Sequence, residues 1–434
     1  MKKKLLVIWL ALCILLPGAF AQEEEEPDYF TSPFQFTFLF PPMSTNGIYN
    51  SRTVNKVSLN LLVGHAGGVD GLELGSLINS DAYFVKGIQV AGFGNVVSGS
   101  STGGQISGFF NVNGESATGL QSAGFINING TGTAGAQLAG FMNINSTSTS
   151  GFQGAGFGNM SGASMRGAQV SGFINVSGDT TRGAQLAGFI NVAPRFDKGV
   201  QAAGFVNVSG RGSLNGQASG FLNRADEIHG VQATGFVNIA GYVRGVQLAG
   251  FLNVCDSIDG IPVGFISVVR KNGYRKFEFS SSEIAYANFS YKMGVRRFYN
   301  IYTIGKLPKD GSRWLVGAGF GYEHGLGEQI LLNIEAMTHQ ELWFADSRTG
   351  RLLAFDRLNM VNQVRANFGM ILSDKVSMFI GPTFNVSVAE SDPYIGRIGY
   401  HEIGPRWSMI NTTRNNVQQT HVKIWVGING GVRF

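Results

Sequence analysis

Side chains alternate with a period of two through the middle of the chain. In the segment 183–192 (GAQLAGFINV) one face carries Ala184, Leu186, Gly188, Ile190 and Val192, and the other carries Gln185, Ala187, Phe189 and Asn191. This period is the pattern of a β-strand, because successive side chains of a strand point to opposite sides. Segments rich in Ser, Thr, Gly and Asn, such as 98–102, 146–150 and 177–181, predict turns between the strands.

This unit recurs eleven times as the motif G-x-Q-x-x-G-F-x-N. The glutamines follow one another in steps of 16 residues from Gln89 to Gln217, and the last two copies come in steps of 15. Degenerate copies, with Glu73 or Pro262 in place of Gln, flank the array, as capping of a repeat stack requires. The first Gly of the motif is replaced only by Asn215, a residue type that tolerates positive φ, which predicts a left-handed corner there.

Two all-β architectures fit the repeat. In a β-solenoid each repeat is one coil, and like residues stack about 4.8 Å apart into Asn and Gln ladders and Phe stacks. In an outer-membrane barrel each repeat is one strand, but barrel turns alternate between short and long, and the linkers show no such alternation. In a barrel, neighbouring strands run antiparallel, so a fixed register of identical residues would not align them into ladders. Parallel coils do align them. We predict a repeat β-solenoid of about 16-residue coils over 71–268, with one larger β-barrel as the alternative.

Gln, Phe and Asn recur in the same register in the copies of the motif. We interpret them as a structural core ladder that satisfies backbone groups. The alternative interpretation is a ligand site repeated along the coils. Because variation concentrates in the linkers, recognition of a partner is expected there.

Near residue 270 the composition shifts towards charged and aromatic residues. Alternating segments follow at 283–293, 298–304, 314–322, 330–343, 361–372, 376–388 and 422–434. In the last segment an apolar face from Val422 to Phe434 alternates with a polar face from Lys423 to Arg433, like the C-terminal strand of bacterial outer-membrane barrels. We predict an antiparallel β-barrel-like domain over 269–434, with a soluble antiparallel β-sandwich, or a sheet with one buried face, as the alternative. Two further strands in the region 34–70, at Phe34–Phe40 and Val57–Val63, are candidates to pair with this C-terminal set, which would make the solenoid an insertion.

The amino terminus reads as an export signal. Three lysines, an apolar run from Leu5 to Leu16 and the A-x-A site Ala19–Ala21 predict a signal peptide over 1–21, followed by an acidic leader over 22–33. Cleavage would leave Cys255 as the single cysteine, which excludes an intramolecular disulfide. The formal net charge of +5 includes three lysines of the signal, and no basic stripe suggests a nucleic-acid partner.

Catalytic chemistry finds little support in the sequence. No catalytic, cofactor-binding or metal-binding residue is predicted, because the six histidines form no metal-binding spacing and Gly317–Gly321 (GAGFG) lies within an alternating strand. A carbohydrate-active β-helix enzyme would need clustered carboxylates. The densest charged group comprises Asp179, Arg182, Arg195, Asp197 and Lys198. Its two acids, Asp179 and Asp197, are offset by two residues from the 16-residue register and so do not occupy matching positions of neighbouring coils. We therefore expect no enzyme.

The repeats, with Pro42–Gly47 (PMSTNG) ahead of them and 259–265 (DGIPVGF) plus 271–274 (KNGY) after them, resemble the Gly-Gln-Gly-Phe-Asn surface-repeat proteins of Bacteroidetes and Leptospira. The resemblance covers about residues 40–275 and implies surface exposure or outer-membrane association. It supplies no catalytic residues. We therefore expect an exported cell-surface or outer-membrane protein that acts as a structural scaffold or an adhesin, with a glycan or a surface protein as its possible ligand. An outer-membrane channel is the alternative.

Overall fold

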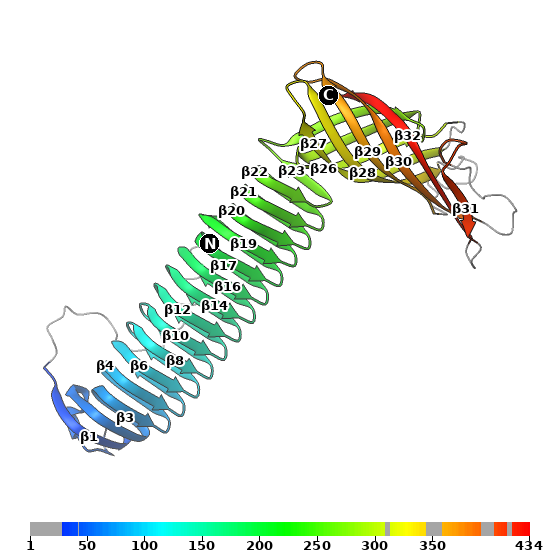
Figure 1. Cartoon of the computed structure of the whole chain (residues 1–434). Coiled ribbons are helices and arrows are strands. Elements are labelled where there is room, and N and C mark those ends of the chain that lie inside the picture. Colours follow the sequence, from blue (N-terminus) through cyan, green and yellow to red (C-terminus); the bar gives the residue numbers. More distant parts are fainter. Residues whose placement is uncertain (1–27, 42, 309–312, 344–357, 392–402, 415–418) are drawn as a thin grey trace, which may run out of the picture. The chain divides into compact units, whose positions relative to one another are not determined.

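The computed structural model describes residues 28–41, 43–308, 313–343, 358–391, 403–414 and 419–434. The predicted signal peptide and most of the acidic leader lie outside these residues. By its contacts the chain divides into two compact units, Met1–Asp226 and Glu227–Phe434. The described residues are almost entirely strand, with one short 3-10 helix, and they form a parallel β-solenoid of about 13 turns and a closed antiparallel barrel of eight strands (Figure 1). The predicted fold class is confirmed.

The elements of the solenoid are β1 (Phe30–Leu39), β2 (Met43–Ser44), η1 (Gly47–Arg52), β3 (Thr53–Gly75), β4 (Ile78–Ala91), β5 (Gly94–Val97), β6 (Ser100–Ser107), β7 (Phe110–Asn113), β8 (Ala117–Ala123), β9 (Ile126–Asn129), β10 (Thr133–Ala139), β11 (Met142–Asn145), β12 (Thr149–Ala155), β13 (Gly158–Ser161), β14 (Met165–Ser171), β15 (Ile174–Ser177), β16 (Thr180–Ala187), β17 (Ile190–Ala203), β18 (Val206–Arg211), β19 (Ser213–Ser219), β20 (Leu222–Thr234), β21 (Val237–Ala249), β22 (Leu252–Val263) and β23 (Ile266–Val269). The elements of the barrel domain are β24 (Tyr274–Ser282), β25 (Ala287–Val295), β26 (Phe298–Lys306), β27 (Arg313–Gly325), β28 (Ile330–Trp343), β29 (Asn359–Ile371), β30 (Ser377–Ser391), β31 (Ile410–Arg414) and β32 (Gln419–Arg433).

Parallel pairing between successive coils joins like residues to like residues. Gln137 of β10 lies opposite Gln121 of β8 and Gln153 of β12, and the glycines and alanines of the same strands follow that register. A 16-residue step therefore advances the chain by one coil. The alternative of one larger β-barrel is wrong, because barrel walls of this kind are antiparallel and these strands are parallel.

Each coil contains two strands separated by a bend, and this bend corrects the predicted position of the phenylalanines. In one coil β14 ends at Ser171, Gly172 and Phe173 form the bend, and β15 begins at Ile174. Gln169 and Asn175 face the interior, whereas Phe173 is 40% exposed. The phenylalanines do stack, with ring centroids of Phe173 at 5.0 Å from Phe157 and 4.9 Å from Phe189, but they stack on the outside.

The interior of the coils is lined by ladders of buried amides. Gln137 donates from Nε2 to Oε1 of Gln121 in the preceding coil at 2.8 Å. Asn127 donates from Nδ2 to Oδ1 of Asn143 in the following coil at 2.8 Å, and also to the backbone carbonyl of Leu138 at 2.7 Å. The ladders thus satisfy both each other and the backbone, as the sequence predicted.

Interior positions beside the ladders are mostly polar in the middle coils and mostly apolar in the last coils. One column runs from Asn129 and Asn145 to Ser161 and Ser177, and then to Ala193, all buried. A facing column has Thr149 opposite Met165 in the pairing register, and later coils carry Phe196, Leu214 and Ile228 in their interior. Smaller residues in one column accompany larger residues in the other, which keeps the interior filled.

The first glycine of the motif has positive φ, but it lies within a strand and not at a corner. Gly167 in β14 has φ of +121°, and a Cβ built on it would lie 2.0 Å from the carbonyl oxygen of Gly151 in the preceding coil. Asn215 departs from the prediction, because the described residues contain one non-glycine with positive φ, which is Lys198. Asn215 instead accepts a hydrogen bond from the backbone N–H of Gly199 at 2.8 Å through its side-chain oxygen.

The amino-terminal strands belong to the solenoid. β1 begins at Phe30, within the predicted leader, and pairs in parallel with β3 from Phe30 opposite Thr53 to Leu39 opposite Val63. The hypothesis that these strands pair with the C-terminal set is therefore wrong. Hydrophobic alternation predicts a strand but does not specify its partner.

The barrel is an antiparallel meander from β24 to β30, followed by β32, which pairs with both β30 and β24. Pairing of Glu278 with Arg433 and of Phe279 with Val432 closes the sheet on itself. β31 adds a short strand beside the first half of β32. Closure removes the free edges of the sheet.

Candidate functional site

The outer surface of the barrel is apolar. Large hydrophobic side chains point away from the lumen on all eight strands that close the barrel: Phe277, Phe279, Phe289, Ile304, Phe320, Ile334, Val364, Phe368, Ile380, Phe384, Val426 and Ile428. Phe320 is 55% exposed, and Ile380 and Ile428 are each 59% exposed. A monomeric soluble domain rarely leaves so much contiguous apolar surface uncovered.

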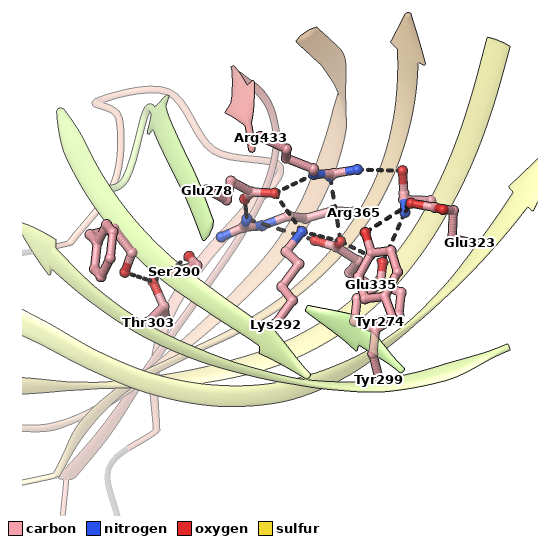
Figure 2. A network of polar contacts seen from close by, with 12 residues as sticks. Tyr274, Glu278, Ser290, Lys292, Tyr299, Thr303, Glu323, Glu335, Arg365 and Arg433 are labelled. Atoms are coloured by element: carbon pink, nitrogen blue, oxygen red, sulfur yellow. Dashed lines mark hydrogen bonds and ion pairs between the residues drawn. The ribbon is translucent and has the colours of Figure 1, made fainter. Parts of the chain in front are cut away.

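The lumen of the barrel holds a network of buried charges (Figure 2). Lys292 of β25 lies between the carboxylates of Glu278 on β24 and Glu335 on β28, and all three side chains are fully buried. Arg433 of β32 donates from Nε to Glu278 Oε2 at 2.6 Å, and Arg365 of β29 lies 3.5 Å from Glu278 Oε1. Each carboxylate therefore faces more than one cation, as burial of charge requires.

Tyrosine and phenylalanine side chains extend this network to the remaining strands. Asn333 of β28 joins them, because its amide donates to Tyr299 at 3.0 Å and to Glu323 at 3.2 Å. Tyr299 of β26 donates to Glu335 at 2.8 Å, and Tyr274 of β24 donates to Glu323 of β27 at 2.8 Å (Figure 2). On β30 the ring of Phe379 lies 4.2 Å from the guanidinium carbon of Arg433. All eight strands that close the barrel therefore contribute to one connected cluster in the lumen.

An apolar cluster fills another level of the lumen. It consists of Ile284, Ala285, Leu307, Leu315, Val361, Ile403 and Trp425, each at most 3% exposed. Beside it, Glu283 accepts hydrogen bonds from Thr383, Asn385 and the indole N–H of Trp425 at 2.8–3.3 Å. Side chains thus fill the lumen at two levels, as the dimensions of an eight-stranded barrel permit.

The densest charged group predicted on the solenoid forms surface ion pairs. Asp197 Oδ1 lies 2.9 Å from Arg195 Nε, and Asp197 Oδ2 lies 3.4 Å from Arg182 Nη2, with both arginine side chains more than half exposed. The neighbouring Arg195 guanidinium lowers the pKa of the Asp197 carboxyl, so Asp197 is a poor proton donor. Asp179 contacts Arg195 through its backbone carbonyl, which accepts a hydrogen bond from the backbone N–H of Arg195 at 3.2 Å.

Metal-ligating residues do not converge within the described part of the chain. No group of three or more His, Cys, Asp or Glu side chains there is arranged to hold a metal ion. Among the histidines, His401 lies outside the described residues, and His229 pairs with Glu227 at the surface. Cys255 is buried in β22, and burial raises the pKa of its thiol to about 12, which makes it unreactive.

Helices of the described residues offer no candidate for a membrane span, since none is both long and apolar enough. Comparisons of the chain with protein-family models, with curated proteins and with solved structures give no match.

Sequence reasoning missed the lumen network and the strand that begins it. No strand was predicted at Tyr274–Ser282, although Phe277 and Phe279 face outward there and Glu278 faces inward. The alternation of aromatic and charged residues in this segment was the signal that could have identified it.

Proposed function

We propose that this protein is an outer-membrane protein in which the barrel anchors the solenoid, and that the solenoid serves as a structural scaffold of the bacterial envelope. The observation that carries the proposal is the polarity of the barrel: phenylalanines and isoleucines cover its outside, while Lys292, Glu335 and Arg365 are buried inside. A soluble barrel has the opposite arrangement, whereas an apolar outer band and a polar interior are typical of outer-membrane barrels.

The filled lumen favours anchoring over transport. Charged and apolar side chains occupy it at two levels, and an eight-stranded barrel is just wide enough for its own side chains. We therefore assign the barrel no channel function. The solenoid supports the scaffold role, because amide ladders and backbone pairing join every coil to its neighbours and the variable linkers remain available to a glycan or a protein ligand.

Fractionation of cells that express the full chain tests the proposal. The chain is expected in the outer-membrane fraction, and without boiling it should migrate in detergent gels at a position different from that of the boiled chain. A soluble chain whose migration is unaffected by heat would contradict the proposal.

A matched pair of arginine substitutions gives a sharper test. Val364 of β29 is 49% exposed and Leu186 of β16 is 40% exposed, so both are apolar surface residues. Val364→Arg should destabilise the inserted barrel by about 2–4 kcal/mol in lipid vesicles, since arginine within the apolar band is costly. Leu186→Arg should change stability by about 0.5 kcal/mol or less, because water surrounds it. Equal effects of the two changes would contradict a lipid-facing barrel.

A further inference from the structure

The two ends of the barrel differ in the length of their connections. At one end, which we call the turn end, residues 296–297, 326–329 and 372–376 join neighbouring strands and the chain finishes at Phe434. At the opposite end, the loop end, the connections are 283–286, 307–312, 344–358 and 392–409, the last two being the longest of the barrel. In outer-membrane barrels the short turns face the periplasm and the long loops face the exterior.

The solenoid is connected to the barrel at the turn end. The first barrel strand, β24, starts at Tyr274, which pairs with Gly294 next to the turn at 296–297. Its last residues, near Ser282, lie towards the loop end. The chain therefore enters the barrel from the side on which Phe434 also lies, since Phe277 and Phe434 exchange backbone hydrogen bonds of 2.9 and 3.0 Å.

The link between the two domains is too short to carry the solenoid to the other side of a membrane. β23 ends at Val269 and β24 begins at Tyr274, which leaves residues 270–273 as the connection. Fully extended, this link spans at most about 18 Å, since each residue advances the chain by about 3.6 Å. The apolar band of such a barrel is about 25 Å tall. The buried charges and the apolar cluster also block a path through the lumen.

From these observations we infer that the solenoid lies on the periplasmic side of the outer membrane. The inference rests on the proposed function, and it names the compartment in which the scaffold works. Partners of the variable linkers are then components of the periplasm, and the linkers are shielded from host surfaces and external glycans. An adhesin role for the solenoid is disfavoured by this placement.

Cysteine labelling of the full chain in intact cells tests the inference. Three exposed positions report the two sides: Ser148 in a linker of the solenoid, Glu328 in a turn of the turn end, and Thr412 on β31, which pairs with the loop-end half of β32. A membrane-impermeant maleimide should label Thr412→Cys in intact cells. Ser148→Cys and Glu328→Cys should be labelled only after the outer membrane is permeabilised. The unsubstituted chain is the control, because its Cys255 is buried.

The outcomes separate the inference from the proposed function. Labelling of Ser148→Cys in intact cells, with the chain still in the outer-membrane fraction, would overturn the inference and leave the membrane barrel in place. Recovery of all three variants in a soluble fraction, with identical labelling, would overturn the proposed function itself. Digestion of intact cells by an external protease gives a second measurement: the coils should stay uncleaved until the membrane is permeabilised.

Discussion

Asparagine and glutamine occupy interior positions of the coils that most domains fill with aliphatic residues. Within the array most of these buried amides have the same amide as their neighbour in the adjacent coils, as Asn159, Asn175 and Asn191 do. Asn175 donates to Asn191 at 3.0 Å and to the carbonyl of Leu186 at 2.7 Å, and it accepts from Asn159 at 2.9 Å. The residue stabilises the fold by satisfying polar groups that have no access to water.

Asn175 should therefore contribute more to stability than Phe173, which lies two residues before it in the same coil. Asn175→Ala removes the partners of a buried carbonyl and of two amides, and each unsatisfied group costs about 1–3 kcal/mol. Phe173→Ala loses two ring stacks on a half-exposed surface, and such pairs are worth about 0.5–1.5 kcal/mol each. Denaturant unfolding of the two variants measures the difference. A larger loss for Phe173→Ala would contradict the interior amide ladder.

Asp81 and Glu73 are the carboxylic acids at the start of the ladders. Gln89 donates to both, at 2.6 Å to Asp81 and 2.8 Å to Glu73. Burial, and then the adjacent Glu73, raise the pKa of Asp81 well above its ordinary value of 3.8. Because the folded pKa is the higher one, the stability that protonated Asp81 contributes is fully present below 3.8 and is lost as the pH rises through the raised pKa.

Asp81→Asn should remove this pH dependence. An asparagine can make the bonds that Asn113 makes two coils further on, where its amide exchanges hydrogen bonds of 3.0 Å with Gln105. As the pH rises above 3.8, hydrogen exchange of the first coils should accelerate less in Asp81→Asn than in the native chain. Identical pH profiles would show that Asp81 titrates as an ordinary surface acid.

The residue scale is also where sequence and structure differ most. The 16-residue step predicted the coils and the amide ladders, because identical residues in identical register are visible in the sequence itself. The outward position of Phe173 was not predictable from alternation, since the bend at Gly172–Phe173 shifts which residues face inward. The partners of Lys292 lie on β24 and β28, and the stagger of the closed sheet brings them together; no local pattern encodes that stagger.

Among the elements, the strands that carry the motif are held close to one another by a column of glycines. Gly103 in β6 has φ of +118°, and a Cβ on it would lie 2.1 Å from the carbonyl oxygen of Gly87. The next residue, Gly104, has no atom within 4 Å of the equivalent position. Of these two adjacent glycines in one strand, only Gly103 lies where a side chain would clash with the preceding coil.

Gly103→Ala should destabilise the solenoid, whereas Gly104→Ala should not. The backbone conformation alone costs about 1–3 kcal/mol for a non-glycine residue at such a φ, and the contact with Gly87 adds to this cost. Gly104→Ala should be neutral or stabilise slightly, because it restricts the unfolded chain. Thermal unfolding of both variants by circular dichroism decides between them, and equal midpoints would mean that the coils can separate to admit a side chain.

At the scale of the whole molecule, the barrel depends on one cluster to which every strand of its wall contributes. Lys292 is the cation between two buried carboxylates, and removal of one partner from a buried ion pair costs about 3–5 kcal/mol. Lys292→Met should lower the temperature at which the barrel loses its heat-modifiable migration in detergent. Lys375→Met, in an exposed turn between β29 and β30, is the matched control and should leave it unchanged. A barrel that tolerates both changes equally would show that packing alone closes the sheet.

The opposite donation of the two amide ladders has a consequence for how long the array can become. Glutamines donate towards the amino-terminal coils and asparagines donate towards the carboxy-terminal coils, as Gln137 and Asn127 do. A single ladder would align its amide dipoles head to tail and place partial charges at its ends, as in an α-helix. Two opposed ladders in one interior cancel most of that field. Duplication of a 16-residue unit would then lengthen the solenoid without an electrostatic penalty at either terminus, so the ladders set no limit on the number of coils.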